Sequence, residues 1–246
     1  MSDWLSRTRL LIDEERLQRL RNSNVLIVGL GGVGSFAAEM ICRAGVGKIT
    51  IADGDVVHVT NRNRQLIALK STEGIAKAEV TEKRLKDINP ELELTVIKEY
   101  LRDKRMEEVL NEGYDYVVDA IDTLSPKVYL IYHSMVRNIP VVSSMGSGGR
   151  LDPLAIRIGD ISETSVCPLA RMLRKRLHKL GIRKGFTAVY SVEPPDKNKI
   201  IPVKGEKNKA SVTGTISYMP AAFGIACASV VIHDLAGIER LNLNDL

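Results

Sequence analysis

The sequence has few cysteines. Cys42, Cys167 and Cys227 are an odd number, lie far apart and form no C-x-x-C pair. This spacing predicts neither a disulfide framework nor a structural zinc site, and it is typical of a protein from a reducing compartment.

The sequence also has no secretion signal and no unbroken apolar run. Its amino terminus has neither the basic start nor the apolar stretch of a secretion signal. The longest stretch without charge, 210–233, is interrupted by Gly214, Pro220 and Gly224, so we expect a buried helix there rather than a membrane span. We therefore expect a cytoplasmic protein with no membrane partner.

Acidic residues are absent from one strongly basic segment. The chain carries 35 Lys and Arg against 30 Asp and Glu, a formal net charge of +5. Without the segment 171–184 the balance would be 28 against 30, so the excess positive charge belongs to this segment and indicates a polyanionic partner. Its basic residues are Arg171, Arg174, Lys175, Arg176, Lys179, Arg183 and Lys184.

Apolar, β-rich runs alternate with helical patterns along the first part of the chain. We expect strands at 24–28, 48–52, 92–97, 114–120 and 141–143, and helices at 33–44, 74–88, 102–110 and 126–138. This alternation predicts an α/β fold with a doubly wound, mostly parallel, Rossmann-like sheet.

The pattern changes beyond Gly146. We expect strands at 155–161 and 187–192, helices at 168–180 and 220–235, and a mobile loop at 193–211. Since 246 residues suit one large α/β domain, we interpret 1–246 as a single domain. Its nucleotide-binding core would span about 23–145 and its C-terminal, substrate-facing lobe about 146–246.

The segment 29–34 has the pattern G-x-G-x-x-G. Glycines at positions 29, 31 and 34 allow a tight strand-to-helix turn, close approach of a phosphate and close helix packing, and the bare amides attract an anion. Asp53 follows nineteen residues after Gly34, where its carboxylate can accept hydrogen bonds from ribose hydroxyls. The segment therefore predicts a nucleotide-binding turn.

The turn alone does not choose the nucleotide, because an NAD-dependent oxidoreductase would show the same turn and acid. Asp55, Asn61, Arg64, Gln65 and Lys77 follow it. A triphosphate with a reactive α-phosphorus needs several cations, and Arg64 and Lys77 can supply them. These residues favour ATP; the alternative is that both cations belong to a solvated face.

Two acids, Asp119 and Asp122, lie at the carboxyl end of the strand expected at 114–120. Ligands of open α/β sheets bind at that edge, and Asp122 could hold magnesium on the phosphates. The alternative for Asp122 is capping of the helix that begins near Pro126.

The ordered motifs between Gly29 and Asp122 resemble those of the adenylyltransferases related to ubiquitin-activating enzymes. This ThiF/MoeB-type superfamily includes the activators of the sulfur carriers for thiamine and molybdopterin. The motifs that carry the resemblance are Gly29-Leu30-Gly31-Gly32-Val33-Gly34, Asp53-x-Asp55, Asn61-x-x-Arg64-Gln65, Lys77 and Asp119-x-x-Asp122.

The resemblance implies a role for each matching position. The backbone at Gly31 and Gly32 would hold phosphate, and Asp53 would hold the ribose. The triphosphate would be bound by Asn61, Arg64 and Lys77, and magnesium by Asp122. Arg9 looks like the amino-terminal arginine that family homodimers insert into the neighbouring subunit's ATP site; the alternative is a simple charge at a helix entry.

The chain departs from the carrier-activating branch in its cysteines. Enzymes of that branch commonly carry two C-x-x-C pairs for zinc, and many use a catalytic cysteine. Cys42 and Cys227 lie on apolar helical patterns and are expected in the core. Cys167 is the only one expected near the site, where a nucleophilic role is the alternative to a structural one.

The second half resembles the tRNA threonylcarbamoyladenosine dehydratases, and the match covers nearly the whole chain. Its motifs are Met145-Gly146-Ser147-Gly148, Leu151-Asp152-Pro153, Asp160-Ile161, Thr164-Ser165, Pro168-Leu169-Ala170-Arg171 and Tyr190-Ser191-x-Glu193-Pro194. The resemblance implies that ATP activates the threonyl carboxylate of the modified adenosine beside the tRNA anticodon, which then cyclises.

The basic segment fits such a substrate. Leu169, Met172, Leu173, Leu177 and Leu180 fall at helical spacing, which predicts one packed face and an outer face of cations for RNA phosphates. Aromatic residues are only 4% of the chain, but Phe186 and Tyr190 could stack on a base of the anticodon loop.

Two rival functions remain open. One is an adenylyltransferase that activates the carboxyl terminus of a small sulfur carrier. The other is a non-catalytic nucleotide-binding partner of sulfur-transfer proteins, with the basic helix as its docking surface.

Overall fold

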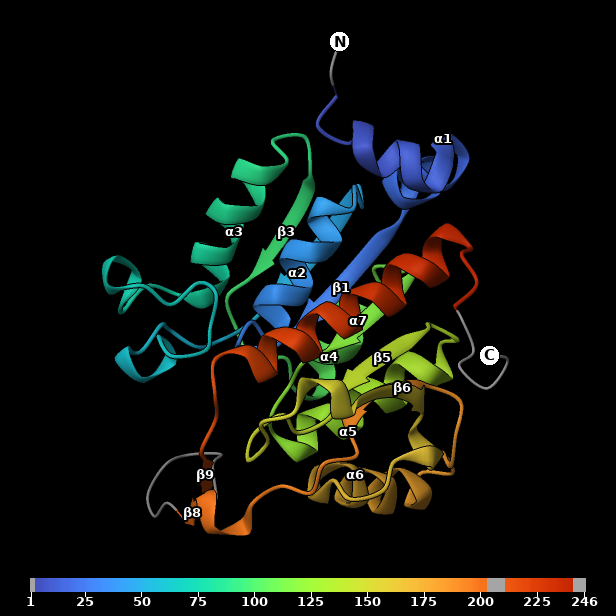
Figure 1. Cartoon of the computed structure of the whole chain (residues 1–246). Helices are drawn as coiled ribbons and strands as arrows, with labels where there is room; N and C mark the ends of the chain where they lie inside the picture. The colour runs from blue at the N-terminus through green and yellow to red at the C-terminus, as the bar shows by residue number, and fades with distance from the viewer. Residues whose placement is uncertain (1–2, 203–210, 241–246) are drawn as a thin grey trace.

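A seven-stranded sheet organises the chain in the computed structural model, which describes residues 3–202 and 211–240 (Figure 1). The strand order is β3-β2-β1-β4-β5-β7-β6, and β6 alone in this sheet runs antiparallel to its neighbour. The strands are β1 (Asn24–Val28), β2 (Lys48–Ala52), β3 (Glu93–Ile97), β4 (Tyr116–Asp119), β5 (Val141–Ser144), β6 (Ile156–Asp160) and β7 (Thr187–Ser191). This order confirms the doubly wound α/β fold.

The chain winds outward from β1 in both directions, so the strand order reverses between β1 and β4. Ligands of open α/β sheets bind outside the carboxyl ends of the strands at such a switch point. Gly29 directly follows β1, and Ala120 directly follows β4. The topology therefore brings the glycine turn and the Asp122 loop to the same place.

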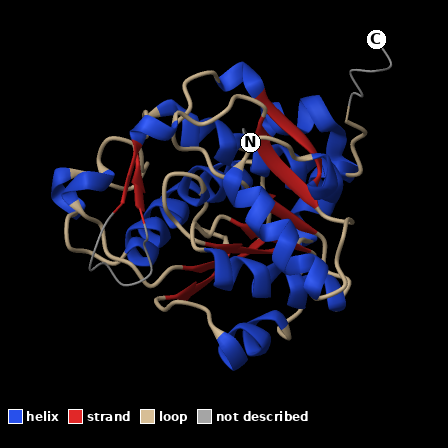
Figure 2. Ribbon diagram, turned by 90° about the horizontal axis from the view of Figure 1, so that it is seen from below, coloured by secondary structure: helices blue, strands red, loops and turns tan. Residues whose placement is uncertain are grey.

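Helices cover both faces of the sheet (Figure 2). Val25 and Ile27 of β1 face a cluster built with α2 and α7, whereas Leu26 and Val28 face one built with α4, α5 and α6. Alternate residues of a strand point to opposite faces, so β1 is buried on both sides. The helices are α1 (Ser6–Asn22), α2 (Gly34–Arg43), α3 (Lys77–Ile88), α4 (Asp103–Leu110), α5 (Leu124–Val136), α6 (Pro168–Lys179) and α7 (Tyr218–Ala236).

Helix α7 is the one described helix that is long and apolar enough to cross a membrane. It instead packs on α2 so closely that a β-carbon at Gly224 would overlap the backbone carbonyl oxygen of Val33. Its Met219, Phe223 and Val230 are fully buried. The expectation of a buried core helix in this region is confirmed.

Several local expectations need correction. Helix α3 starts at Lys77 rather than at 74, because Gly74 has φ +81°, which a right-handed helix does not accommodate. The expected loop 193–211 contains strand β8 (Ile200–Pro202), which pairs with β9 (Ser211–Thr213); the rest of that prediction, 203–210, lies outside the described residues. The sequence did not predict α1, whose Asp13 interrupts the helix with φ +70°.

Candidate active site

The four glycines of the turn differ in how much space surrounds each of them. Gly29 has φ +90°, and a β-carbon there would lie 2.7 Å from the Ala120 carbonyl oxygen. A β-carbon at Gly34 would overlap the Gly29 carbonyl oxygen, whereas at Gly31 the nearest atom would be Gln65 Nε2 at 3.6 Å. Gly29 and Gly34 are therefore required by the turn itself, while Gly31 leaves room above it. A β-carbon at Gly32 would meet Pro220 of α7.

Asp53 ties this turn to the end of β2. Its Oδ2 accepts the Leu30 N–H at 2.6 Å, and its Oδ1 accepts the Asp55 N–H at 2.8 Å. Burial raises the pKa of Asp53, while the charge of Lys77 and these two hydrogen bonds oppose the rise. Each carboxylate oxygen has a second lone pair, so the residue can also accept a ribose hydroxyl.

Lys77 is nearly buried at the first position of α3, with 5% of its surface exposed. Its Nζ lies 2.9 Å from Asp55 Oδ2, and the Tyr100 hydroxyl donates to the other oxygen of Asp55. A buried ammonium is costly unless it is paired. The alternative that Lys77 belongs to a solvated face is therefore wrong.

Arg64 lies in the same loop system, near Asp122. Its Nη1 donates to the Thr60 carbonyl and to Asn63 Oδ1, both at 2.9 Å. Burial lowers the pKa of Arg64, and the negative charge of Asp122 opposes this. The cation and the acid that the sequence predicted to share a site do interact across the 58 residues that separate them in sequence.

Asn61 and Gln65 are both buried beside the turn. Asn61 Oδ1 accepts the His58 N–H at 3.0 Å, which closes the 3-10 turn η1 (Val59–Asn61). Gln65 Oε1 has no hydrogen-bond partner in the described structure, and the Nε2 of the same side chain faces Gly31. Asn61 therefore shapes the loop with its oxygen, and Gln65 is the side chain with spare hydrogen-bonding capacity there.

Asp119 does not share the exposed edge with Asp122. It is fully buried and forms an ion pair of 2.8 Å with Lys127 of α5, which is also fully buried. Asp119 does lie at the carboxyl end of β4, as predicted, but its burial and its ion pair turn it away from the ligand edge, which leaves Asp122 alone of the two acids exposed there. Lys127 was not predicted; the one signal in the sequence was a lysine within an otherwise apolar helical run.

The donor set suits magnesium only in combination with phosphate. Across residues 3–202 and 211–240, no group of three or more His, Cys, Asp or Glu side chains could hold a metal ion. Magnesium is typically held by one or two carboxylates together with substrate phosphates. Asp122, which interacts with Arg64, fits that role.

All three cysteines are buried. Burial raises the pKa of the Cys42 thiol to about 11 and that of Cys227 to about 12. Both are core residues, as expected. Cys167 is also buried, beside Gly146, and a thiol out of contact with solvent does not favour the nucleophile alternative.

Arg9 lies at the other end of the sheet from the phosphate turn. Helix α1 precedes the amino end of β1, at the top of Figure 1, while the turn follows its carboxyl end. Arg9 forms ion pairs with Asp3, at 2.6 Å, and with Glu14. Within one chain, this arginine is therefore held by its own amino-terminal segment.

Helix α6 buries Ala170, Leu173 and Leu177, but Met172 and Leu180 are exposed, contrary to expectation. Its packed face is therefore narrower than the leucine spacing predicted. Phe186 and Tyr190 are buried in the core, so the suggestion that they stack on an RNA base is wrong.

The cations of the basic segment fall into two groups. Arg174 is half-buried and donates to the Thr164 carbonyl at 2.7 Å, and Arg176 donates to Ser125 Oγ at 2.9 Å. Arg176 is itself exposed, and so are the remaining five cations of the segment: Arg171, Lys175, Lys179, Arg183 and Lys184. Two of the predicted RNA ligands thus have a structural contact, and five point to solvent.

The sequence did not predict Arg150 as a site residue, because no motif in its neighbourhood marks it. It is buried, and its Nε donates to the Glu193 carbonyl at 2.9 Å while Nη1 donates to the Gly146 carbonyl. Its Nη2 has no hydrogen-bond partner in the described structure. The guanidinium therefore joins the loop after β5 to the segment after β7.

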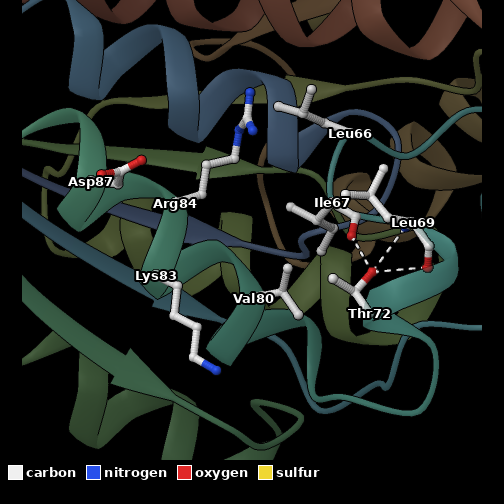
Figure 3. Close-up of a pocket in the computed structure, with 8 residues that line it drawn as sticks. All are labelled: Leu66, Ile67, Leu69, Thr72, Val80, Lys83, Arg84 and Asp87. Atoms are coloured by element: carbon white, nitrogen blue, oxygen red, sulfur yellow. Dashed lines mark hydrogen bonds between the residues drawn. The ribbon is translucent and has the colours of Figure 1, made fainter.

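A groove of about 510 Å³ lies between α3 and the loop before it (Figure 3). Leu66, Ile67 and Val80 line its apolar part, and Lys83, Arg84 and Asp87 lie along its charged side. None of the predicted phosphate ligands lines this groove. The groove and the nucleotide site are therefore built from different residues.

The fold and this site together define a nucleotide-binding α/β enzyme. The doubly wound sheet has a glycine turn at its switch point, and a buried lysine and an arginine that interacts with an acid lie in the loops around it. The chain belongs to the ThiF family, whose model matches residues 5–246.

Two kinds of relatives support this assignment. The chain is 40% identical over 243 residues to tRNA threonylcarbamoyladenosine dehydratase of Bacillus subtilis, covering 96% of this chain and 95% of that protein. It is similar to the crystal structure of Escherichia coli tRNA N6-threonylcarbamoyladenosine dehydratase in complex with ATP, with TM-score 0.87, 35% identity, and coverage of 95% and 93% of the two chains. The complex of the same Escherichia coli enzyme with AMP gives TM-score 0.85, 36% identity, and coverage of 94% and 93%.

Proposed function

We propose that this chain is a tRNA-modifying enzyme that uses ATP to dehydrate threonylcarbamoyladenosine in tRNA, by adenylylating its carboxylate and cyclising it. The observation that carries the proposal is the end-to-end similarity to dehydratases, at 40% identity, together with a site whose turn, lysine and arginine match ATP. Solved complexes of such a relative with ATP and with AMP correspond to the substrate and product of adenylyl transfer.

The first step forms a bond between a carboxylate oxygen of the substrate and the α-phosphorus of ATP, and breaks the bond from that phosphorus to pyrophosphate. In the second step an atom of the same threonylcarbamoyl group attacks the activated carbonyl, and AMP leaves with the former carboxylate oxygen. The modified nucleoside thus loses one water. Because the nucleophile is intramolecular, its effective concentration is high, and no enzyme cysteine is required.

The chain's own residues bind and polarise the triphosphate. The backbone amides at Gly31 and Gly32 would bind phosphate, because these residues directly precede the amino end of α2, which favours anions. Lys77 and Arg64 offset the charge that develops on the phosphate oxygens. Lys77 already has Asp55 as a partner, at 2.9 Å, so its ammonium is held in one direction before ATP binds.

Magnesium belongs to the same proposal. When bound, it would neutralise charge on the phosphate oxygens and the leaving pyrophosphate. Asp122 would be its protein ligand, and Arg64 beside it would limit the net charge of the site.

The exposed cations of α6 and of the loop after it would bind phosphates of the anticodon loop. The segment contains no acid that would oppose an RNA backbone. Such binding is electrostatic and strongly dependent on salt. The proposal also includes a cytoplasmic homodimer, in which Arg9 reaches the partner's ATP site, and contact with sulfur-transfer proteins.

Mass spectrometry of nucleosides tests the reaction directly. tRNA incubated with the protein, ATP and magnesium should yield the threonylcarbamoyl nucleoside minus one water, and Asp122→Ala should abolish this product. If pyrophosphate exchange were instead stimulated by a small sulfur-carrier protein and not by tRNA, the carrier-activating function would replace the proposal.

A further inference from the structure

The Asp119 and Lys127 ion pair is fully buried, although neither residue has a place in the mechanism above. The two charged groups are 2.8 Å apart, and both side chains are 0% exposed. Ser143 Oγ also donates to Asp119 Oδ2 at 2.7 Å, and the Ile121 N–H donates to Oδ1 at 3.2 Å. The network joins β4, β5, α5 and the loop between β4 and α5.

Stability alone does not account for such a pair. Desolvation of two charges offsets most of their attraction, and well-packed apolar replacements of buried ion pairs are often as stable or more stable. Polar networks in cores instead fix one particular arrangement of the chain. The relevant question is therefore which arrangement this pair fixes.

The pair encloses the short turn that leads to Asp122. Lys127 Nζ donates to the Ile121 carbonyl at 3.0 Å, so it holds the peptide directly before Asp122. On the other side of the turn, Ala120 N–H donates to the Val28 carbonyl at 2.9 Å, and Ala120 lies against Gly29. One side of this turn thus supports the phosphate turn, and the other ends at Asp122.

We propose that Asp119 and Lys127 are a positioning pair that fixes the 119–121 turn and thereby aims the Asp122 carboxylate at magnesium on the phosphates of ATP. The inference rests on the proposed ATP site. Both side chains are fully buried, so neither touches the substrate: among the described residues Asp119 binds Lys127, Ser143 and the Ile121 N–H, and Lys127 acts through the backbone of Ile121.

Binding of ATP at a series of magnesium concentrations, measured by calorimetry without tRNA, tests the pair. The double variant Asp119→Leu/Lys127→Met removes both charges together and avoids a lone buried charge. We expect it to fold and to bind ATP without magnesium as the natural protein does, because Asp53 and Ala52 still hold the turn. The magnesium concentration for half-maximal tightening should rise by about tenfold or more, as for other outer-shell partners of metal ligands.

Tyr116→Phe is the matched control. Tyr116 lies on the same strand, is buried, and donates to Asp234 at 2.7 Å. Loss of this hydrogen bond should lower the midpoint of thermal unfolding without changing how ATP affinity depends on magnesium concentration. An equal shift in this control would overturn the proposal, since it would mean general loosening of the core.

Unchanged magnesium dependence in the folded double variant would also overturn the proposal. If that variant does not fold, Ser143→Ala serves as the test instead, because it removes one hydrogen bond to Asp119. This variant should raise the magnesium concentration for half-maximal tightening, and an unchanged concentration would contradict the role of the pair. Absence of nucleoside dehydration by the natural protein would contradict the proposed function alone, because the binding measurement contains no tRNA.

Discussion

Single glycines in the phosphate turn meet different steric demands. Gly34 has no room for a β-carbon because of the Gly29 carbonyl, whereas Gly31 has open space up to Gln65. The absence of a side chain at Gly31 therefore leaves room for a ligand, whereas at Gly34 it allows the backbone of the turn to pack closely.

Substitution by alanine should separate these two demands. Gly31→Ala should fold normally but weaken ATP binding by about 1–2 kcal/mol, or about tenfold, because the new methyl group occupies phosphate space. Gly34→Ala should instead give little folded protein. Thermal unfolding and ATP titration measure both effects, and normal ATP affinity in Gly31→Ala would contradict this account of the turn.

Lys77 offers a second test at the scale of a residue. Lys77→Ala should lower tRNA-dependent AMP formation by about 10²–10³-fold, as loss of one preorganised charge-stabilising group does in other enzymes. Lys83→Ala is the matched control, because Lys83 lies on the same helix with an exposed side chain. Its rate should stay within about twofold of the natural protein. A Lys77→Ala rate close to that of the control would exclude a catalytic role for Lys77.

At the scale of an element, α6 has two kinds of cation. Arg174 and Arg176 attach the helix to Thr164 and to Ser125 in the first turn of α5. Arg171, Lys175 and Lys179 are exposed. The helix is thus fixed through some of its positive charges and presents the others to solvent.

The exposed set should carry the RNA affinity. The triple variant Arg171→Ala/Lys175→Ala/Lys179→Ala should bind tRNA more weakly. Its salt slope should be smaller by about 2, because the loss of three phosphate contacts means that fewer counterions are released on binding. The matched control, Lys70→Ala/Lys83→Ala/Lys104→Ala, removes equal charge from exposed positions elsewhere. Equal losses in both variants, measured by filter binding over a salt series, would assign the effect to net charge and not to α6.

At the scale of the whole molecule, Arg9 and the phosphate turn lie at opposite ends of the sheet. If Arg9 contributes to catalysis, it must therefore reach the site of a second copy. This arrangement is possible in a two-fold symmetric dimer, where each copy gives its partner what it receives.

Mixed dimers test this exchange. Arg9→Ala and Lys77→Ala should each be nearly inactive. After subunit exchange, about half of the dimers in an equimolar mixture hold one subunit of each variant, and one of the two sites in such a dimer is intact. The mixture should therefore recover about one quarter of the natural AMP-forming rate. Each variant subjected to exchange with itself is the control. A mixture as inactive as its components shows that Arg9 does not act across a dimer.

The two parts of the chain also share one framework. Strands β7 and β6 extend the sheet beyond β5, and α7 packs on α2 at the phosphate turn. We propose that residues on both sides of position 146 form one folding unit, because the core under the nucleotide turn includes residues from both.

Each strand of the large sheet was predicted within two residues of its observed bounds. The inner strands are buried on both faces and form continuous apolar, β-branched runs, whereas the partly exposed edge strands β3 and β6 alternate between apolar and polar residues, so both signals are local. Helix α1 was missed because its sequence is rich in charge and is interrupted at Asp13. Strands β8 and β9 were missed because each has three residues and is paired only with the other within the described structure.

The sequence by itself determined the glycine turn, the order of the nucleotide motifs and the family, because these depend on residue types at fixed spacing. Only the tertiary structure decided which polar side chains face a ligand. Asp119 and Asp122 are three residues apart, yet Lys127 of the next helix and Ser143 of the next strand surround the first, whereas Arg64, 58 residues before it, interacts with the second. Burial depends on what distant segments bring near, and no local pattern contains that information.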